Sequence, residues 1–69
     1  MESYRRVLGR NVRAARKLRG WSQEELAFET DIDRTYISGI ERGVRNPSLD
    51  MIAKLAKTLK TSPAKLLER

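Results

Sequence analysis

Apolar residues recur at helical spacing in two long stretches of this 69-residue chain. Within residues 3–18 and 49–59 they return every three or four positions, which places them on one face of a helix. These faces consist of Leu8, Val12, Ala15 and Leu18 in the first stretch and Leu49, Ile52, Leu55, Ala56 and Leu59 in the second. No stretch alternates apolar and polar residues as a half-buried strand does. The pattern predicts two amphipathic helices that share a core.

Residues 22–46, between these helices, carry the start and stop signals of two short helices. Ser22 stands three residues before Glu25, the spacing of a capping box in which hydroxyl and carboxylate each accept a hydrogen bond from a free amide. Asp33 can cap a second helix in the same way. Gly43 supplies the left-handed conformation that ends this second helix.

The two short helices are expected over residues 23–29 and 34–42, so only about three residues, 30–32, remain for the turn. Two short helices joined by so tight a turn follow the plan of a helix-turn-helix. A further helix is expected over 63–68, because a serine cap is followed there by a proline at the first helical position. Since no linker divides the chain, residues 1–69 are expected to form one all-α domain of five helices.

The charge is positive and unevenly spread. The net charge is +6, and ten of the fifteen basic residues are arginines. Residues 1–20 and 34–69 are basic, whereas residues 22–33 carry five carboxylates and no base. Positive potential on a small domain favours a polyanion, and arginine suits phosphates and base edges. The alternative is that the arginines only solvate helix faces.

The composition excludes several classes of function. The chain has no cysteine and no histidine, which removes disulfides, thiolate metal sites and the commonest general base. It has no apolar run long enough for a membrane span or a signal peptide. No nucleophile with its base and no glycine-rich phosphate loop is visible. We therefore expect a cytoplasmic protein that is not an enzyme and has no metal, cofactor or small-molecule ligand.

The helix predicted over residues 34–42 has an outward face of mostly small residues. Opposite the apolar Ile37 and Ile40, the outward set is Thr35, Ser38, Gly39 and Arg42. Threonine, serine and glycine propagate a helix poorly. They keep the backbone low, however, and so allow a helix to press into a DNA major groove about 12 Å wide.

Two residues flank this outward face. Arg34, at the helix start, can reach a guanine edge through O6 and N7, and the alternative is a phosphate contact. For Tyr36, one interpretation is contact with a thymine methyl or the groove wall. The other is that the ring only packs over the turn, with its hydroxyl on a phosphate.

The phrase WSQEELA, followed by DRTYISGIERGVRNPSLDMIAKLAK, resembles the lambda-repressor-like (Xre-type) helix-turn-helix family from Leu8 to Leu67. Within that family it is most similar to the small controller proteins of bacterial restriction–modification systems. The resemblance implies a compact five-helix domain with the helix-turn-helix at its second and third helices. It also implies a sequence-specific transcriptional regulator that binds a pseudo-palindromic DNA operator as a homodimer, with the third helix in the major groove.

The resemblance also implies roles for single residues. The residues that match base-contacting positions are Arg34, Thr35, Tyr36 and Ser38. Those that match phosphate-contacting positions are Gln23, Arg42, Arg45 and Asn46. Gly39 stands where some relatives carry a long polar reader, so a base contact is expected to be missing there. Asp31 occupies the turn position where relatives usually have glycine.

The resemblance also implies one contact within the protein, and the apolar fifth helix suggests one between two copies. Arg16 and Glu41 match a family pair that bridges the first and third helices, and the alternative is that Arg16 faces a phosphate. Leu66 and Leu67 are expected to form the dimer interface, and the alternative is that both only close the monomer core.

The sequence leaves three other kinds of partner open, namely RNA polymerase, a partner protein and RNA. The acidic set Glu24, Glu25 and Glu29 is a candidate for a contact with RNA polymerase, with a solvated helix face as the alternative. An antitoxin-like or other protein-binding module could use the same fold and dock a protein on its fifth helix. RNA is a weaker option, because the chain lacks clustered aromatics for stacking on unpaired bases.

Overall fold

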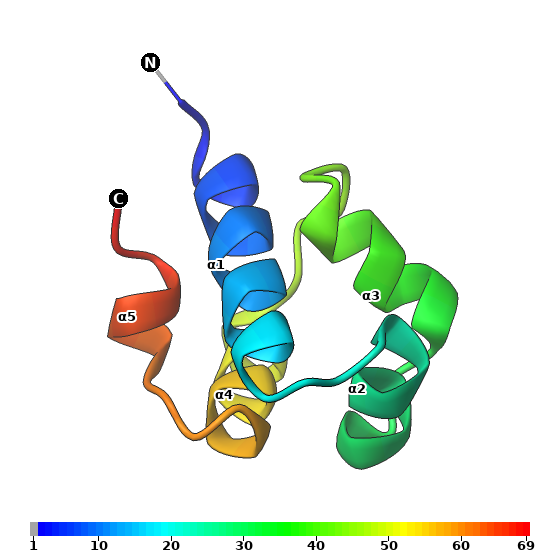
Figure 1. Cartoon of the computed structure of the whole chain (residues 1–69). Helices are drawn as coiled ribbons and strands as arrows, with labels where there is room; N and C mark the ends of the chain where they lie inside the picture. The colour runs from blue at the N-terminus through cyan, green and yellow to red at the C-terminus, as the bar shows by residue number, and fades with distance from the viewer. Residues whose placement is uncertain (1) are drawn as a thin grey trace.

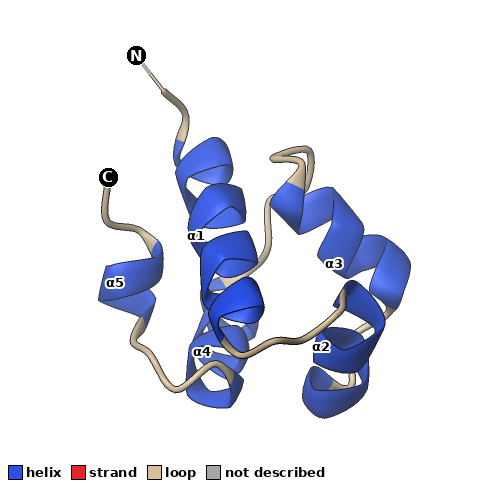
Figure 2. Ribbon diagram, viewed as in Figure 1, coloured by secondary structure: helices blue, strands red, loops and turns tan. Residues whose placement is uncertain are grey.

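The computed structural model describes residues 2–69 and folds them into five helices without a strand (Figure 1). The helices are α1 (Tyr4–Leu18), α2 (Gln23–Thr30), α3 (Arg34–Glu41), α4 (Leu49–Thr58) and α5 (Pro63–Leu66). Figure 2 shows that short loops connect them. This arrangement confirms the all-α class. The observed bounds lie within one residue of the expected ones, except that α5 ends two residues earlier.

Each helix begins at a polar cap. The serines Ser3, Ser22, Ser48 and Ser62 accept a backbone amide at the starts of α1, α2, α4 and α5, and Asp33 does so at α3. At α2 the capping box is complete, because the Ser22 hydroxyl accepts from the Glu25 amide at 3.0 Å and the Glu25 carboxylate accepts from the Ser22 amide at 2.8 Å. These caps satisfy amides that a helix leaves without partners.

The turn between α2 and α3 is made by Asp31. Its backbone is left-handed (φ 56°, ψ 39°), a conformation that aspartate adopts more readily than most residues. The amide of Ile32 then donates to the carbonyl of Ala27 at 3.1 Å and closes the end of α2. The departure from glycine at this position therefore leaves the turn intact.

All five helices contribute to one hydrophobic core. Its members are Leu8, Val12, Leu26, Ile32, Ile37, Ile40, Ile52, Leu55, Ala56, Leu59 and Leu66. Two leucines that the helical pattern assigned to the core are exposed instead, Leu18 by 89% and Leu49 by 76%. Leu18 is the last residue of α1, and it lies about 80° around the helix from Leu8, at the edge of the apolar stripe. Leu49 is the first residue of α4. Helical spacing predicts which side of a helix faces the core, but it does not predict how far the neighbouring helices cover that side.

The helices α1 and α3 touch at Gly9. A Cβ built on Gly9 would lie 2.3 Å from the carbonyl oxygen of Ile40 and 2.8 Å from that of Glu41. Both neighbours are backbone atoms, so neither can turn aside as a side chain would. The missing side chain of Gly9 thus sets how closely α3 approaches α1.

We expect Gly9→Ala to lower the free energy of unfolding by about 1–3 kcal/mol, the usual cost of overpacking. The loss should occur although alanine is better than glycine by about 1 kcal/mol inside a helix. Urea unfolding followed by circular dichroism measures it. Ala14→Gly, at an exposed position of the same helix, reports propensity alone. A Gly9→Ala protein as stable as the parent would show that the contact does not require glycine.

Candidate nucleic-acid interface

The face of α3 that points away from the core carries the residues predicted to contact bases. Ile37 and Ile40 are buried and hold the helix from inside. On the other side Arg34 and Thr35 are exposed and Ser38 is partly buried, while Tyr36, on the flank, is partly buried and packs against the core. Asp33 fixes the start of the helix, because its carboxylate accepts the Thr35 amide at 2.8 Å. The structure therefore brings the four predicted base-contacting residues together on the first two turns of α3.

The loop after α3 folds back along the helix. Gly43 is left-handed (φ 76°), and the Val44 amide donates to the Gly39 carbonyl at 3.0 Å. Three of the predicted phosphate-contacting residues, Arg42, Arg45 and Asn46, are exposed at and beyond the end of α3. The loop thus presents two arginines beside the outward face of α3.

The position of Gly39 differs from the expectation. Gly39, expected to lie open on the outward face, is buried, and the nearest side chain to it is that of Arg45. The Arg45 guanidinium carbon lies 5.3 Å from the centroid of the Tyr36 ring, a cation–π distance. A glycine in the middle of a short helix was the available signal, because it costs helix propensity unless something approaches closely.

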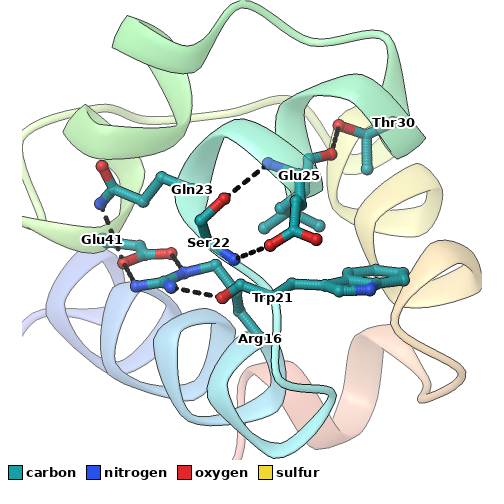
Figure 3. A network of polar contacts seen from close by, with 8 residues as sticks. Arg16, Trp21, Ser22, Gln23, Glu25, Thr30 and Glu41 are labelled. Carbon is teal, nitrogen blue, oxygen red and sulfur yellow. Dashed lines mark hydrogen bonds and ion pairs between the residues drawn. The ribbon is translucent and has the colours of Figure 1, made fainter.

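A buried ion pair joins α1 to the end of α3 (Figure 3). The Arg16 guanidinium donates to the Glu41 carboxylate twice, from Nε at 2.7 Å and from Nη2 at 2.9 Å. Its third donor, Nη1, reaches the carbonyl oxygen of Trp21 at 2.8 Å. The hydrogen bond to Glu41 raises the pKa of Arg16, so the guanidinium stays charged. The pair fixes the end of α3 against α1 and the start of α2.

Gln23 belongs to the same network. Its Nε2 donates to Glu41 Oε1 at 3.1 Å, so the side-chain amide is directed toward the carboxylate (Figure 3). Gln23 is the first residue of α2, and its backbone N–H therefore lies at a helix N-terminus, where amides have no partner within the helix. This end of α2 is suited to an anion such as a phosphate.

The expected dimer contact through Leu66 needs correction. The Leu66 side chain is only 2% exposed and packs into the monomer core, so it has almost no surface for a partner. Asn11 holds this end of the chain on α1, because its Nδ2 donates to the carbonyl oxygens of Leu66 at 2.9 Å and Glu68 at 2.7 Å. Leu67 remains partly accessible.

Leu67 lies in an apolar cleft between the starts of α1 and α4 and the end of α5. The apolar residues that line this cleft are Tyr4, Leu8, Pro47, Leu49, Ile52 and Leu67. Tyr4 is 60% exposed and Leu49 76%. We call these six residues the α1–α4–α5 cleft.

The three glutamates proposed for a contact with RNA polymerase lie on α2. Glu24, Glu25 and Glu29 are exposed, and Phe28, which is 83% exposed, lies on the same helix. Glu25 already serves in the capping box, which leaves the other two carboxylates free of such a role.

No helix in the described part of the chain is long and apolar enough to cross a membrane.

Comparison with known proteins gives consistent matches. The helix-turn-helix family model matches residues 12–66. The control protein C.BamHI from Bacillus amyloliquefaciens is 52% identical over 65 residues, which cover 93% of this chain and 80% of the relative. The solved restriction-modification controller protein C.AhdI from Aeromonas hydrophila has a TM-score of 0.85 at 45% identity, covering 90% of this chain and 94% of that one. SinR of Bacillus subtilis, solved in complex with DNA, has a TM-score of 0.84 at 34% identity and covers 88% of this chain and 98% of that one.

Proposed function

Because this chain belongs to the lambda-repressor-like (Xre-type) helix-turn-helix family, we propose that it is a transcriptional regulator that binds double-stranded DNA. Its similarity to a control protein and to a solved restriction-modification controller also confirms the resemblance to that group. The relatives are regulators and control proteins, and the chain is accordingly not an enzyme.

The observation that carries the proposal is the arrangement around α3. The helix presents short polar side chains outward, with Arg34 at its start. Near its end lie the N-terminus of α2, where Gln23 contacts Glu41, and the arginine-bearing loop that begins at Arg42. A helix that enters the major groove needs such neighbours, with readers on the helix and phosphate contacts beside it. The likeness to SinR, a protein solved with DNA, supports the same orientation.

Sequence would be read by the first two turns of α3. Arg34 contacts a guanine through O6 and N7, and a bidentate pair of this kind discriminates by about 1–3 kcal/mol. Thr35 and Ser38 reach base edges at close range because their side chains are short. Tyr36 contacts the groove wall or a thymine methyl.

Phosphate contacts would hold this register. Gln23 meets a phosphate at the N-terminus of α2, mainly through its backbone amide, since its side-chain nitrogen is engaged by Glu41. Arg42 and Asn46 meet phosphates beyond the end of α3. The charge of the domain, +6, favours this binding without selecting a sequence.

The regulator would bind as a homodimer on two half-sites about 34–36 Å apart. Leu67 contributes to the contact, while Leu66 does not, because it is buried. The α1–α4–α5 cleft supplies the rest of the surface, since Tyr4 and Leu49 are large, apolar and exposed. A second copy of the chain is the occupant that a pseudo-palindromic operator requires.

In the cell this protein would act on the nucleoid. Occupying an operator that overlaps a promoter represses transcription by occlusion. Glu24 and Glu29, exposed on α2, are available for a contact with RNA polymerase that would activate a neighbouring promoter.

Selection of bound sites from a random duplex pool, at about 150 mM salt, tests the proposal. We expect enrichment of a palindrome with two half-sites separated by about one helical turn. Arg34→Ala should remove the preference at one position of each half-site and leave the rest. If the folded protein enriches no sequence, DNA-directed regulation is wrong, and an antitoxin-like or other protein-binding role becomes the better interpretation.

A further inference from the structure

The side chain of Arg45 lies across the outward face of α3 at a place where the helix has none of its own. A Cβ built on Gly39 would lie 2.6 Å from Cγ of Arg45, 3.2 Å from its Nε and 3.4 Å from its Cδ. These are the three nearest atoms, so the stem of Arg45 is what covers Gly39. The burial of a glycine on an otherwise polar face follows from this contact.

Two contacts hold Arg45 in this place. The Val44 amide donates to the Gly39 carbonyl at 3.0 Å and keeps the loop folded back on the helix. At the other end of the side chain, the guanidinium carbon lies 5.3 Å from the centroid of the Tyr36 ring. Tyr36 precedes Gly39 by about one helical turn, so the charged group is carried from the loop toward the start of α3.

This location favours a base over a phosphate. The N-terminal part of a recognition helix contacts base edges, and a group that lies on that part enters the groove with it. The Arg42 side chain lies elsewhere. Its Nε donates to the Ser38 hydroxyl at 3.4 Å, and its backbone is the C-cap of α3. The planar fork of the Arg45 guanidinium, which lies over an aromatic ring, also suits bidentate contact.

We propose that Arg45 reads a base edge in place of the side chain that α3 lacks at Gly39, and that Gly39 is the residue that positions it. The partner is a guanine, contacted through O6 and N7 in the major groove. This inference rests on the DNA-binding function proposed above. It replaces the phosphate contact expected for Arg45 from the sequence, and it restores a base contact where Gly39 alone would leave none.

The first test is a comparison of Arg45→Ala with the parent in site selection, followed by competition between the selected operator and operators changed at single bases. Arg45→Ala should lose the preference at one position of each half-site, where discrimination falls by about tenfold to a hundredfold. Preferences at the other positions should remain. Lys57→Ala, which removes an exposed charge from α4, is the control and should retain every preference.

The second test uses Gly39→Ala. The added methyl group displaces only the flexible stem of Arg45, and alanine is the better helix former, so the thermal midpoint should be unchanged or higher. The base preference lost in Arg45→Ala should nevertheless be lost here as well. Because Gly39 acts through Arg45, the double variant should discriminate no worse than Arg45→Ala alone.

Different outcomes refute different steps. If Arg45→Ala weakens binding equally for all sequences, Arg45 contacts a phosphate and the proposal is wrong. If Gly39→Ala keeps the preference, or loses it together with thermal stability, Gly39 does not position Arg45. A parent protein that enriches no sequence would refute the proposed function and this inference with it, whereas an enriched motif that Arg45→Ala leaves intact refutes only the inference.

Discussion

The affinity for the selected operator is expected to fall by about 10³–10⁵ between 50 and 200 mM salt. A dimer that neutralises about 6–10 phosphates releases as many condensed counterions, and added salt opposes that release. The source of the charge is visible in the structure, where arginines are exposed at the end of α3 and in the loop beyond it. Titrations of labelled operator at several salt concentrations give the slope of log K against log salt.

Charge variants show which residues produce this slope. Each phosphate contributes about 0.9 to the slope, so Arg42→Ala, present twice in a dimer, should reduce its magnitude by about 2. Lys57→Ala, on α4, should leave it unchanged, because α4 carries none of the proposed DNA contacts. A nearly flat salt dependence for the parent would mean that the loop does not face the DNA backbone, and the proposed orientation of α3 would then be wrong.

The features that the sequence predicted well are local ones. The capping box of Ser22 and Glu25 depends on two residues three positions apart, and it is complete in the structure. The start of α3 at Asp33 was predicted from the same kind of signal. Ile37 and Ile40 were assigned to the core from spacing along a single helix, and both are buried. Such signals need no knowledge of how distant segments pack.

The features that the sequence did not reveal depend on contacts between segments. Leu66 and Leu67 are adjacent leucines that the sequence does not distinguish, and the packing of α5 on α1 and α4 decides that Leu66 is the buried one. The position of Arg45 over Gly39 depends on how the loop after α3 folds back, which no periodicity reports. The engagement of Gln23 by Glu41 joins the ends of two helices. The Arg16–Glu41 pair, 25 residues apart, was proposed from family resemblance and not from spacing.

Arg16→Met is expected to lower the free energy of unfolding by about 3–5 kcal/mol, the usual effect of removing one partner of a buried ion pair. The Glu41 side chain is 4% exposed, and without Arg16 its carboxylate would retain only the hydrogen bond from Gln23. The Trp21 carbonyl would lose its donor at the same time. Since small domains are stable by about 5–15 kcal/mol, much of the protein should unfold at elevated temperature. Urea unfolding at 25 °C, followed by circular dichroism, measures the loss.

A second substitution distinguishes an ion pair with Glu41 from a phosphate contact as the role of Arg16. Arg16→Met combined with Glu41→Leu removes both charges, and apolar replacement of a buried pair is often neutral, so most of the lost stability should return. The Gln23 amide, which is only half-buried, can then turn to water. If Arg16→Met alone kept full stability but lost DNA affinity, Arg16 would act on a phosphate and not as a bridge. Stability lost in the single variant and recovered in the double variant would instead assign Arg16 to holding α3 at its angle to α1.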